Sequence, residues 1–283
     1  GVILQGAETP FMKEVLKGIQ EACAEVDNLG GTVLVHKIEH QNAEDVILAM
    51  EKMRMEEVRG IAMVPLDEER VKREIDRFVE EFRIPVVTFT SDVEDTKRLC
   101  FVGQNGVQCG RAAAGLMGEL IGGKGKVAVI SGYSTNTSLS SRVVGFREEI
   151  ARKYPGIEII GPEYCFEENG RAREITEGIF KDVPDLDGIY LTSHGEEGVC
   201  EAIAGVGKAG QVKMVANDFM GRNYELMREG FIHFLIGQDA RIQGYEPVMI
   251  LFRLLFNGEA PERAKIFTEI YIRNEYTIPE GRH

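Results

Sequence analysis

The sequence predicts an α/β protein made of two similar lobes, each built on a doubly wound parallel sheet. Short apolar runs rich in β-branched residues alternate with amphipathic helical patterns, which is typical of a parallel sheet covered by helices on both faces. The whole alternation then occurs a second time beyond residues 101–111. A chain of 283 residues also suits two domains of roughly 100 to 150 residues better than one.

In the first half, strands and helices follow one another in a regular order. The opening run GVILQG is a short apolar strand, and a helix follows from Pro10, with apolar residues three or four positions apart, until Gly30 and Gly31 end it. Asn42 is expected to cap the second helix. The remaining elements expected here are strands at residues 32–38, 60–65 and 85–89 and a helix at residues 68–82.

The second half repeats the scheme with different residues. Its apolar, β-branched runs predict strands at residues 126–132, 157–164, 188–193, 213–218 and 232–238. Helical periodicity between them predicts helices at residues 139–153, 170–181, 196–206 and 222–229. A long helix at residues 242–256 and a β-branched strand at residues 265–273 complete the pattern. Because the repeating unit is a whole lobe, the period is too long for a solenoid.

Charge and cysteine content exclude several classes of protein. The net charge of −13 argues against a nucleic-acid-gripping surface in this segment, because phosphate neutralisation needs clustered Lys and Arg. The 5 cysteines have neither CxxC nor metal-ligand spacing. This pattern indicates that they are small, buried apolar residues, and it favours a reducing compartment for the protein. No run approaches the roughly 18 apolar residues of a membrane span, and no cofactor or metal site is visible.

Polar and aromatic residues follow the ends of the predicted strands. In open parallel sheets, ligands bind outside the carboxyl ends of the strands. The candidate ligand-binding residues are Glu8, Thr9, Phe11, Ser91, Asp92, Ser141, Arg142, Phe166, His194, Asp218 and Gln238. This set suits a small polyhydroxylated ligand, since carboxylates and amides pair with hydroxyls, Arg donates in a planar fork and Phe stacks on an apolar sugar face.

Simpler roles remain open for several of these residues. Arg142 could pair with Glu148 on the same helix, and Phe11 could belong to the core. Asp218 and Gln238 each precede a predicted helix and could cap it. His194 could be a solvated turn residue. The coincidence of so many of them with strand ends favours a binding site.

These residues carry a resemblance to the effector-binding core of the LacI family of bacterial transcription regulators, which shares its fold with periplasmic sugar-binding proteins of the ribose-binding type. The matching segments are Thr9-Pro10-Phe11-Met12, Phe101 to Asn105 with Gly110-Arg111, Ser141 to Phe146, Asn217-Asp218 and Gly237-Gln238. Two positions depart from the family pattern. Met12 stands where a stacking aromatic is usual, and His194 lies in a segment where many members have Asn-Asp.

The resemblance implies a periplasmic binding protein type I fold with a hinge of three crossovers, near Asn105, Asp239 and Ala264. The lobes would comprise residues 1–104 with 240–263, and residues 105–239 with 264–283. It further implies a cytoplasmic, homodimeric regulator with a DNA-binding helix-turn-helix upstream. A sugar-like effector in the interlobe cleft would control operator binding through lobe closure.

Two other functions share these residues. A secreted solute-binding protein of an ABC transporter would have the same lobes and pocket, but no dimer. An apolar stripe of Val71, Ile75 and Phe78 could serve a dimer or the core. An enzyme acting on sugars could use Asp92 and Asp218 as an acid/base pair, but binding uses such residues without chemistry, so no enzyme is expected.

Overall fold

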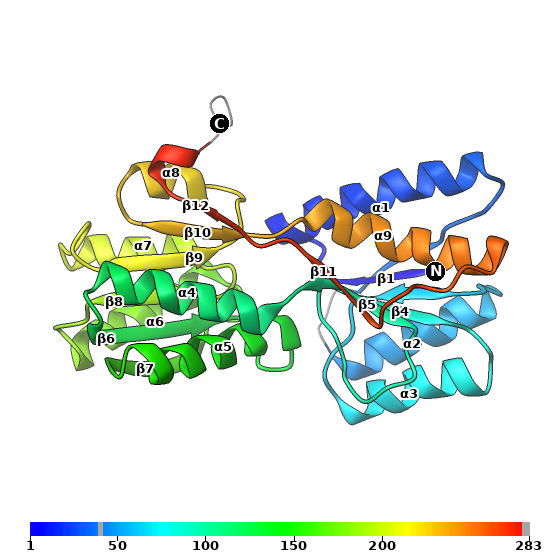
Figure 1. Ribbon diagram of the computed structural model, residues 1–283, viewed down its shortest axis with the longest axis horizontal. Coiled ribbons are helices and arrows are strands. Elements are labelled where there is room, and N and C mark those ends of the chain that lie inside the picture. The colour runs from blue at the N-terminus through cyan, green and yellow to red at the C-terminus, as the bar shows by residue number, and fades with distance from the viewer. Residues whose placement is uncertain (39–41, 279–283) are drawn as a thin grey trace. The chain divides into compact units, whose positions relative to one another are not determined.

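The computed structural model describes residues 1–38 and 42–278, which fold into two compact α/β units (Figure 1). The first unit comprises residues 1–104, 135–138 and 239–269. The second unit comprises residues 105–134, 139–238 and, among the described residues, 270–278. Each unit has its own sheet and its own hydrophobic core. The predicted fold class is therefore confirmed.

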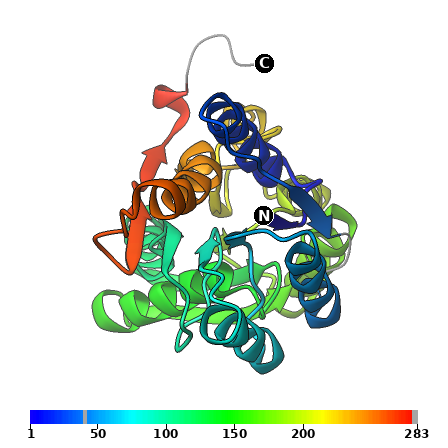
Figure 2. The same ribbon diagram turned by 90° about the vertical axis from the view of Figure 1, so that its right-hand side faces the viewer.

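The first unit is built on a parallel sheet in the order β11-β5-β4-β3-β1-β2. Its strands are β1 (Val2–Gln5), β2 (Val35–Ile38), β3 (Ile61–Met63), β4 (Val86–Phe89), β5 (Cys100–Gln104) and β11 (Lys265–Thr268). Its helices are α1 (Pro10–Asn28), α2 (Ala43–Met55), α3 (Glu69–Glu80) and α9 (Ala240–Phe252), the last continuing into a π-helical turn, Arg253–Asn257. Figures 1 and 2 show α1 and α9 side by side on one face of this sheet, with α2 and α3 on the other.

Local sequence explains where these helices begin. Thr9 caps α1 by accepting a hydrogen bond from the Met12 amide at 3.3 Å, and Pro10 follows at the first helical position. Asn42 caps α2, as predicted, by accepting from the Asp45 amide at 2.9 Å. The apolar stripe of Val71, Ile75 and Phe78 lies on α3. All three side chains are fully buried against the sheet, so the stripe belongs to the core and not to a dimer surface.

The second unit repeats the architecture with the sheet order β12-β10-β9-β8-β6-β7, in which only β12 runs antiparallel to its neighbour. Its strands are β6 (Lys124–Ser131), β7 (Gly156–Tyr164), β8 (Gly188–Leu191), β9 (Lys213–Asn217), β10 (Phe234–Gly237) and β12 (Tyr271–Arg273). Its helices are α4 (Gly106–Leu120), α5 (Thr137–Lys153), α6 (Asn169–Asp182), α7 (Glu196–Gly205) and α8 (Asn223–Arg228), although Thr137 and Ser138 at the start of α5 belong to the first unit. One core lies under α4 and α5, and the other lies under α6, α7 and α8.

The end of the chain differs from the prediction. The single strand expected at residues 265–273 is two strands in different sheets, because β11 pairs in parallel with β5 while β12 pairs antiparallel with β10. The first unit therefore extends to Glu269, and the chain leaves it there instead of near Ala264. Residues 279–283, assigned in advance to the second lobe, lie outside the described residues. The β-branched pattern indicates a strand but does not reveal which sheet the strand joins.

Candidate ligand-binding site

The carboxyl ends of β6, β7, β8, β9 and β10 meet at one edge of the second sheet, because these strands run parallel. Each strand is followed there by a side chain with binding chemistry. These are Tyr133 after β6, Phe166 and Glu167 after β7, Ser193 and His194 after β8, Asp218 after β9 and Gln238 after β10. Helix α5 adds Arg142, with Ser141 half-buried beside it. We call this group the second-sheet site.

Arg142 is a buried cation of the second-sheet site. Its side chain is 1% exposed, and its Nη1 donates to the carbonyl oxygen of Thr192 at 2.6 Å. The predicted alternative of pairing with Glu148 is not adopted, because Glu148 accepts from Arg111 at 2.9 Å. A buried guanidinium is costly unless charged or strongly polar groups satisfy it, so Arg142 has a structural or a ligand-binding role at this position.

Two glycines allow α5 to lie close to α4 and thereby fix the position of Arg142. A Cβ on Gly110 of α4 would lie 2.0 Å from the Arg142 carbonyl oxygen, and one on Gly145 of α5 would lie 2.0 Å from the Val107 carbonyl oxygen. Both distances are far below van der Waals contact. Glycine at both positions is therefore required for this helix crossing.

Asp218 and Gln238 form a hydrogen-bonded pair across neighbouring strands. The Gln238 Nε2 donates to the Asp218 Oδ1 at 3.0 Å. Burial raises the pKa of Asp218, opposed by the positive charge of Arg142 and by the hydrogen bond from Gln238. Neither residue caps a helix, since Arg222 stands at the N-cap of α8 and Asp239 caps α9. Their predicted alternative role is therefore wrong.

His194 is oriented by a buried carboxylate. Its Nδ1 lies 2.8 Å from the Glu196 Oε2, which also accepts from the Gly195 amide at 3.1 Å. The other carboxylate oxygen accepts from Asn223 at 2.8 Å. The hydrogen bond to Glu196 raises the pKa of His194, which favours the protonated ring. His194 is thus a fixed donor at the strand edge and not a freely solvated turn residue.

An aromatic pair provides an apolar surface at the same edge. The rings of Tyr133 and Phe166 have centroids 5.4 Å apart and are tilted by 56°. Phe166 is 46% exposed although it is a large apolar side chain, so its ring remains available to stack on a ligand. Tyr133 was not among the predicted site residues. Its position directly after the predicted strand at residues 126–132 was the available signal.

Glu167 was also missed by the sequence reasoning, although it directly follows Phe166. Burial raises its pKa to about 7, and the negative charges of Asp218 and Glu196 add to the shift, while His194 and Arg142 oppose it. The segment holds both Phe166 and Glu167 at positive φ, 55° and 61°. No sequence motif marks the position, and only its distance from a strand end could have suggested it.

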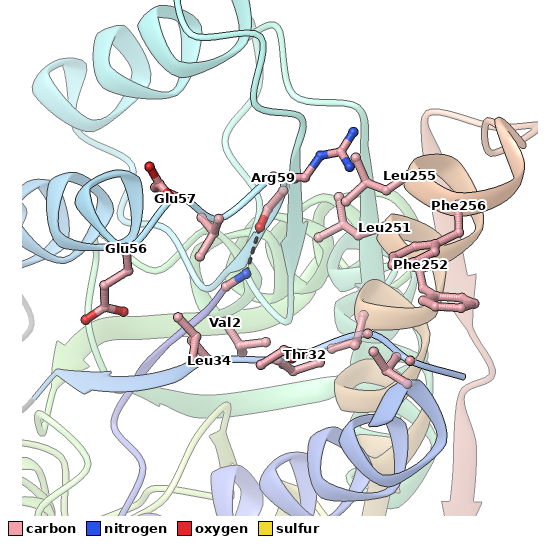
Figure 3. A pocket seen from close by; sticks show the side chains of 18 residues that line it. Val2, Thr32, Leu34, Glu56, Glu57, Arg59, Leu251, Phe252, Leu255 and Phe256 are labelled. Carbon is pink, nitrogen blue, oxygen red and sulfur yellow. Dashed lines mark hydrogen bonds between the residues drawn. The ribbon is translucent and has the colours of Figure 1, made fainter. Parts of the chain in front are cut away.

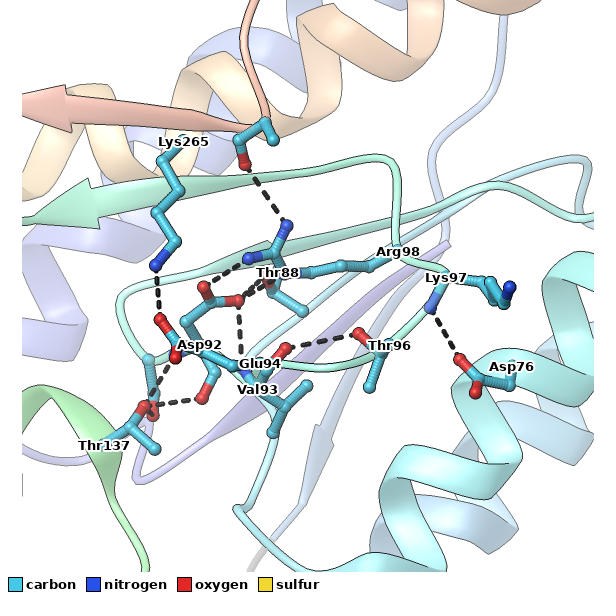
Figure 4. A network of polar contacts seen from close by, with 12 residues as sticks. Asp76, Thr88, Asp92, Val93, Glu94, Thr96, Lys97, Arg98, Thr137 and Lys265 are labelled. Carbon is cyan, nitrogen blue, oxygen red and sulfur yellow. Dashed lines mark hydrogen bonds and ion pairs between the residues drawn. The ribbon is translucent and has the colours of Figure 1, made fainter.

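In the first unit, Asp92 was predicted to bind the ligand, but its carboxylate accepts hydrogen bonds from neighbouring residues of the protein (Figure 4). Arg98 donates to both of its oxygens, and Oδ1 also accepts from the Thr88 hydroxyl at 2.8 Å and the Val93 amide at 2.9 Å. Ser91 is buried, and its hydroxyl lies 3.0 Å from that of Thr137. This arrangement favours a structural role for Asp92 over the predicted ligand contact, because its acceptor capacity is already used.

The residues predicted after β1 have varied surroundings. Glu8 is exposed and pairs with Lys13 at 3.4 Å, which is a surface ion pair of small energetic value. Thr9 serves as the cap of α1, and Phe11 is half-buried in the first turn of that helix. Met12, the departure from the family pattern, is 7% exposed and belongs to the core. Of this group, Phe11 has the side chain best suited to contact a ligand.

A separate apolar cavity of about 340 Å³ lies in the first unit, at the amino ends of its strands (Figure 3). Its wall includes Leu251, Phe252, Leu255 and Phe256 from α9 and the turn after it. This cavity lies at the sheet edge opposite to the strand ends where polar ligands bind.

Within residues 1–38 and 42–278, no cluster of His, Cys, Asp and Glu has the arrangement of a metal site. In the same residues, no helix combines the length and apolar character needed to cross a bilayer.

Known proteins resemble this chain over most of its length. The D-allose-binding periplasmic protein of Escherichia coli is 23% identical, with 84% of this chain and 78% of that protein covered. The D-ribose/D-allose-binding protein of Pseudomonas aeruginosa is 25% identical, with 77% of this chain and 70% of that protein covered. A solved ABC transporter solute-binding protein from Agrobacterium vitis, with bound D-fucose, is 25% identical at a TM-score of 0.91, with 99% of this chain and 96% of that chain covered.

These likenesses contradict the prediction of a LacI-type regulator. The predictions of operator DNA as a partner, of a homodimer and of a cytoplasmic location were wrong for the same reason, since the relatives are solute-binding proteins and one is named as periplasmic. The two classes share a fold and a pattern of strand-end residues. The segments quoted for the resemblance belong to that shared pattern and could not separate them.

The cysteine argument failed for a separate physical reason. Cys100, Cys109, Cys165 and Cys200 are free and buried, and Cys23 is free and half-buried. Burial raises the pKa of Cys100 to about 11 and raises that of the other cysteines as well. Thiols that stay protonated and buried are inert in an oxidising compartment too. Unpaired cysteines of this kind therefore carry little information about location.

A model of one protein family matches residues 1–260, and its description is periplasmic binding protein domain. The match spans both units and agrees with the fold of the solved relative. The relatives above are named as binding proteins, which agrees with the expectation that the chain is not an enzyme. The chain belongs to the periplasmic binding protein domain family.

Proposed function

We propose that this chain is an exported sugar-binding protein that delivers a small carbohydrate to an ABC transporter. The named ligands of its relatives support this, since D-allose, D-ribose and D-fucose are all monosaccharides. An exported receptor also accords with the periplasmic location named for the Escherichia coli relative.

The observation that carries the proposal is the chemistry of the second-sheet site. A sugar hydroxyl both donates and accepts, so it needs acceptors and donors side by side. The Asp218–Gln238 pair supplies the acceptors, and Arg142 and His194 supply charged donors. Phe166, with Tyr133 against it, offers a ring face for the apolar side of a sugar. This combination fits a monosaccharide better than an apolar ligand.

The wild-type chain should be tested by thermal shift against a panel of pentoses and hexoses that includes the three sugars named above. A sugar at 100 times its dissociation constant adds about 2.7 kcal/mol to the free energy of unfolding, which raises the midpoint by several degrees. We expect at least one monosaccharide to stabilise the protein in this way.

Two variants locate the binding. Asp218→Asn should weaken the hit at least tenfold, because the substitution removes one acceptor from the site. Asp185→Asn is the matched control, since Asp185 is exposed, lies before β8 in the same unit and pairs with Lys126 on the surface. Failure of every pentose and hexose to stabilise the protein would refute the proposal. Equal binding by both variants would remove Asp218 from the site.

A further inference from the structure

We infer that Glu167 contacts the ligand directly and selects sugars that carry a protonated amino group. This inference rests on the proposed function and narrows its substrate class. Three features of the second-sheet site support it: the position of the Glu167 side chain, the charges that surround it, and a buried hydroxyl beside it.

Geometry places Glu167 inside the site. A Cβ built on Gly132 would lie 3.0 Å from the Glu167 Cγ and 3.0 Å from the Ser193 Oγ, so these two side chains flank the same point. Ser193 is 3% exposed, and within residues 1–38 and 42–278 its hydroxyl has no hydrogen-bond partner. A buried hydroxyl without a partner costs free energy unless a ligand or a water satisfies it.

The charges around Glu167 do not balance. His194 is matched by Glu196 at 2.8 Å, and Asp218 interacts with the charge of Arg142 and the amide of Gln238. The described part of the chain places no hydrogen-bond donor on the Glu167 carboxylate. The groups that face it electrostatically are Tyr133, Arg142, His194, Glu196 and Asp218. An ionised Glu167 is therefore the surplus negative charge of the site.

A ligand with an ammonium group would supply the missing positive charge. The pKa of Glu167, raised by burial to about 7, means that a neutral sugar meets a carboxyl that resists ionisation. An ammonium group within hydrogen-bond distance would favour the ionised form and form a charge-assisted bond with it. The Ser193 hydroxyl would then accept from or donate to the same ligand edge.

The test compares matched sugars by isothermal titration calorimetry at pH 7, where the amino group of an amino sugar is still largely protonated. The pairs are glucosamine with glucose, galactosamine with galactose, and mannosamine with mannose. For the pair that the site accepts, we expect the amino sugar to bind at least tenfold more tightly. At pH 6, where Glu167 is largely protonated in the empty site, the amino sugar should bind with proton release. Titrations in buffers of different ionisation enthalpy measure that release.

Two variants assign the effect to one residue. Glu167→Gln should abolish both the preference for the amino sugar and the proton release, because glutamine keeps the shape of the side chain but cannot carry its negative charge. Glu168→Gln is the matched control, since Glu168 is the next residue, is exposed and makes no capping hydrogen bond with α6. It should retain the preference. Circular dichroism confirms that both variants are folded. If Glu167→Gln does not fold, Glu167→Asp takes its place. That variant shortens the side chain that carries the carboxylate, and it should reduce the preference for the amino sugar.

Each outcome bears on a distinct claim. If the neutral sugar binds as tightly as its amino counterpart, the inference about Glu167 is overturned while the proposed sugar-binding function stands. A preference that survives Glu167→Gln would place the selection on another residue and would also overturn it. If no amino sugar binds although a neutral monosaccharide stabilises the chain, the inference is overturned and the proposed function stands. If no monosaccharide binds at all, the proposed function fails together with the inference.

Discussion

Replacement of Arg142 by Ala tests the centre of the second-sheet site. The guanidinium is fully buried, donates to the Thr192 carbonyl oxygen at 2.6 Å and offsets the charge of Asp218. Its loss takes away a charged donor that would face the ligand, and it removes the cation that most strongly opposes the rise in the Asp218 pKa. We expect a loss of roughly 2 to 4 kcal/mol of binding free energy, the range for a buried charged partner left unpaired. This corresponds to about a 30- to 1,000-fold rise in the dissociation constant.

The assay is isothermal titration calorimetry with the sugar identified by thermal shift. Arg152→Ala is the control, because Arg152 lies on the same helix, is exposed and pairs with Glu149 on the surface. That variant should bind like the wild type. Urea unfolding of Arg142→Ala in the absence of sugar verifies that the fold persists. Unchanged affinity in a folded Arg142→Ala protein would refute the assignment of Arg142 to the site.

Other predictions concern stability. Gly110→Ala should lower the free energy of unfolding by about 3 kcal/mol or more, because its Cβ would lie 2.0 Å from a backbone oxygen. Gly115→Ala on the same helix meets open space and should raise the free energy of unfolding by about 0.5 to 1 kcal/mol. Urea unfolding measures both changes. Asp92→Asn should cost about 3 to 5 kcal/mol by breaking the buried pair with Arg98, yet leave the sugar affinity of the folded protein unchanged, and a matching loss of affinity would restore Asp92 as a ligand contact. Glu167 has a folded pKa of about 7 against an ordinary 4.5, so the folded state holds its proton longer and stability should fall as pH rises through this window. Unfolding curves at pH 4.5 and pH 8 should show a smaller fall for Glu167→Gln, and an identical fall would contradict the raised pKa.

The order of elements was readable from the sequence because strand and helix periodicities differ clearly. Two features were not readable. Helix α4 is rich in glycine and alanine, so its pattern of apolar side chains is weak, and no helix was assigned there. The pairing of β11 and β12 with different sheets depends on contacts between distant segments, which local pattern does not contain.

The candidate site divides in a similar way. Asp218, Gln238 and His194 could be predicted, because parallel strands bring their carboxyl ends to one edge whatever the details of packing. The commitment of Asp92 to Arg98 depends on tertiary packing, and so does the uncompensated charge on Glu167. The distinction between a regulator and a transport receptor was not visible in these residues, since both classes present the same kind of site.

The most direct test of the account is a crystal structure of the chain with the monosaccharide that gives the largest thermal shift. We expect the sugar ring to lie against Phe166, with its hydroxyls within hydrogen-bond distance of Arg142 and Asp218. A sugar bound away from the carboxyl edge of the second sheet, for instance in the apolar cavity near Leu251, would contradict it.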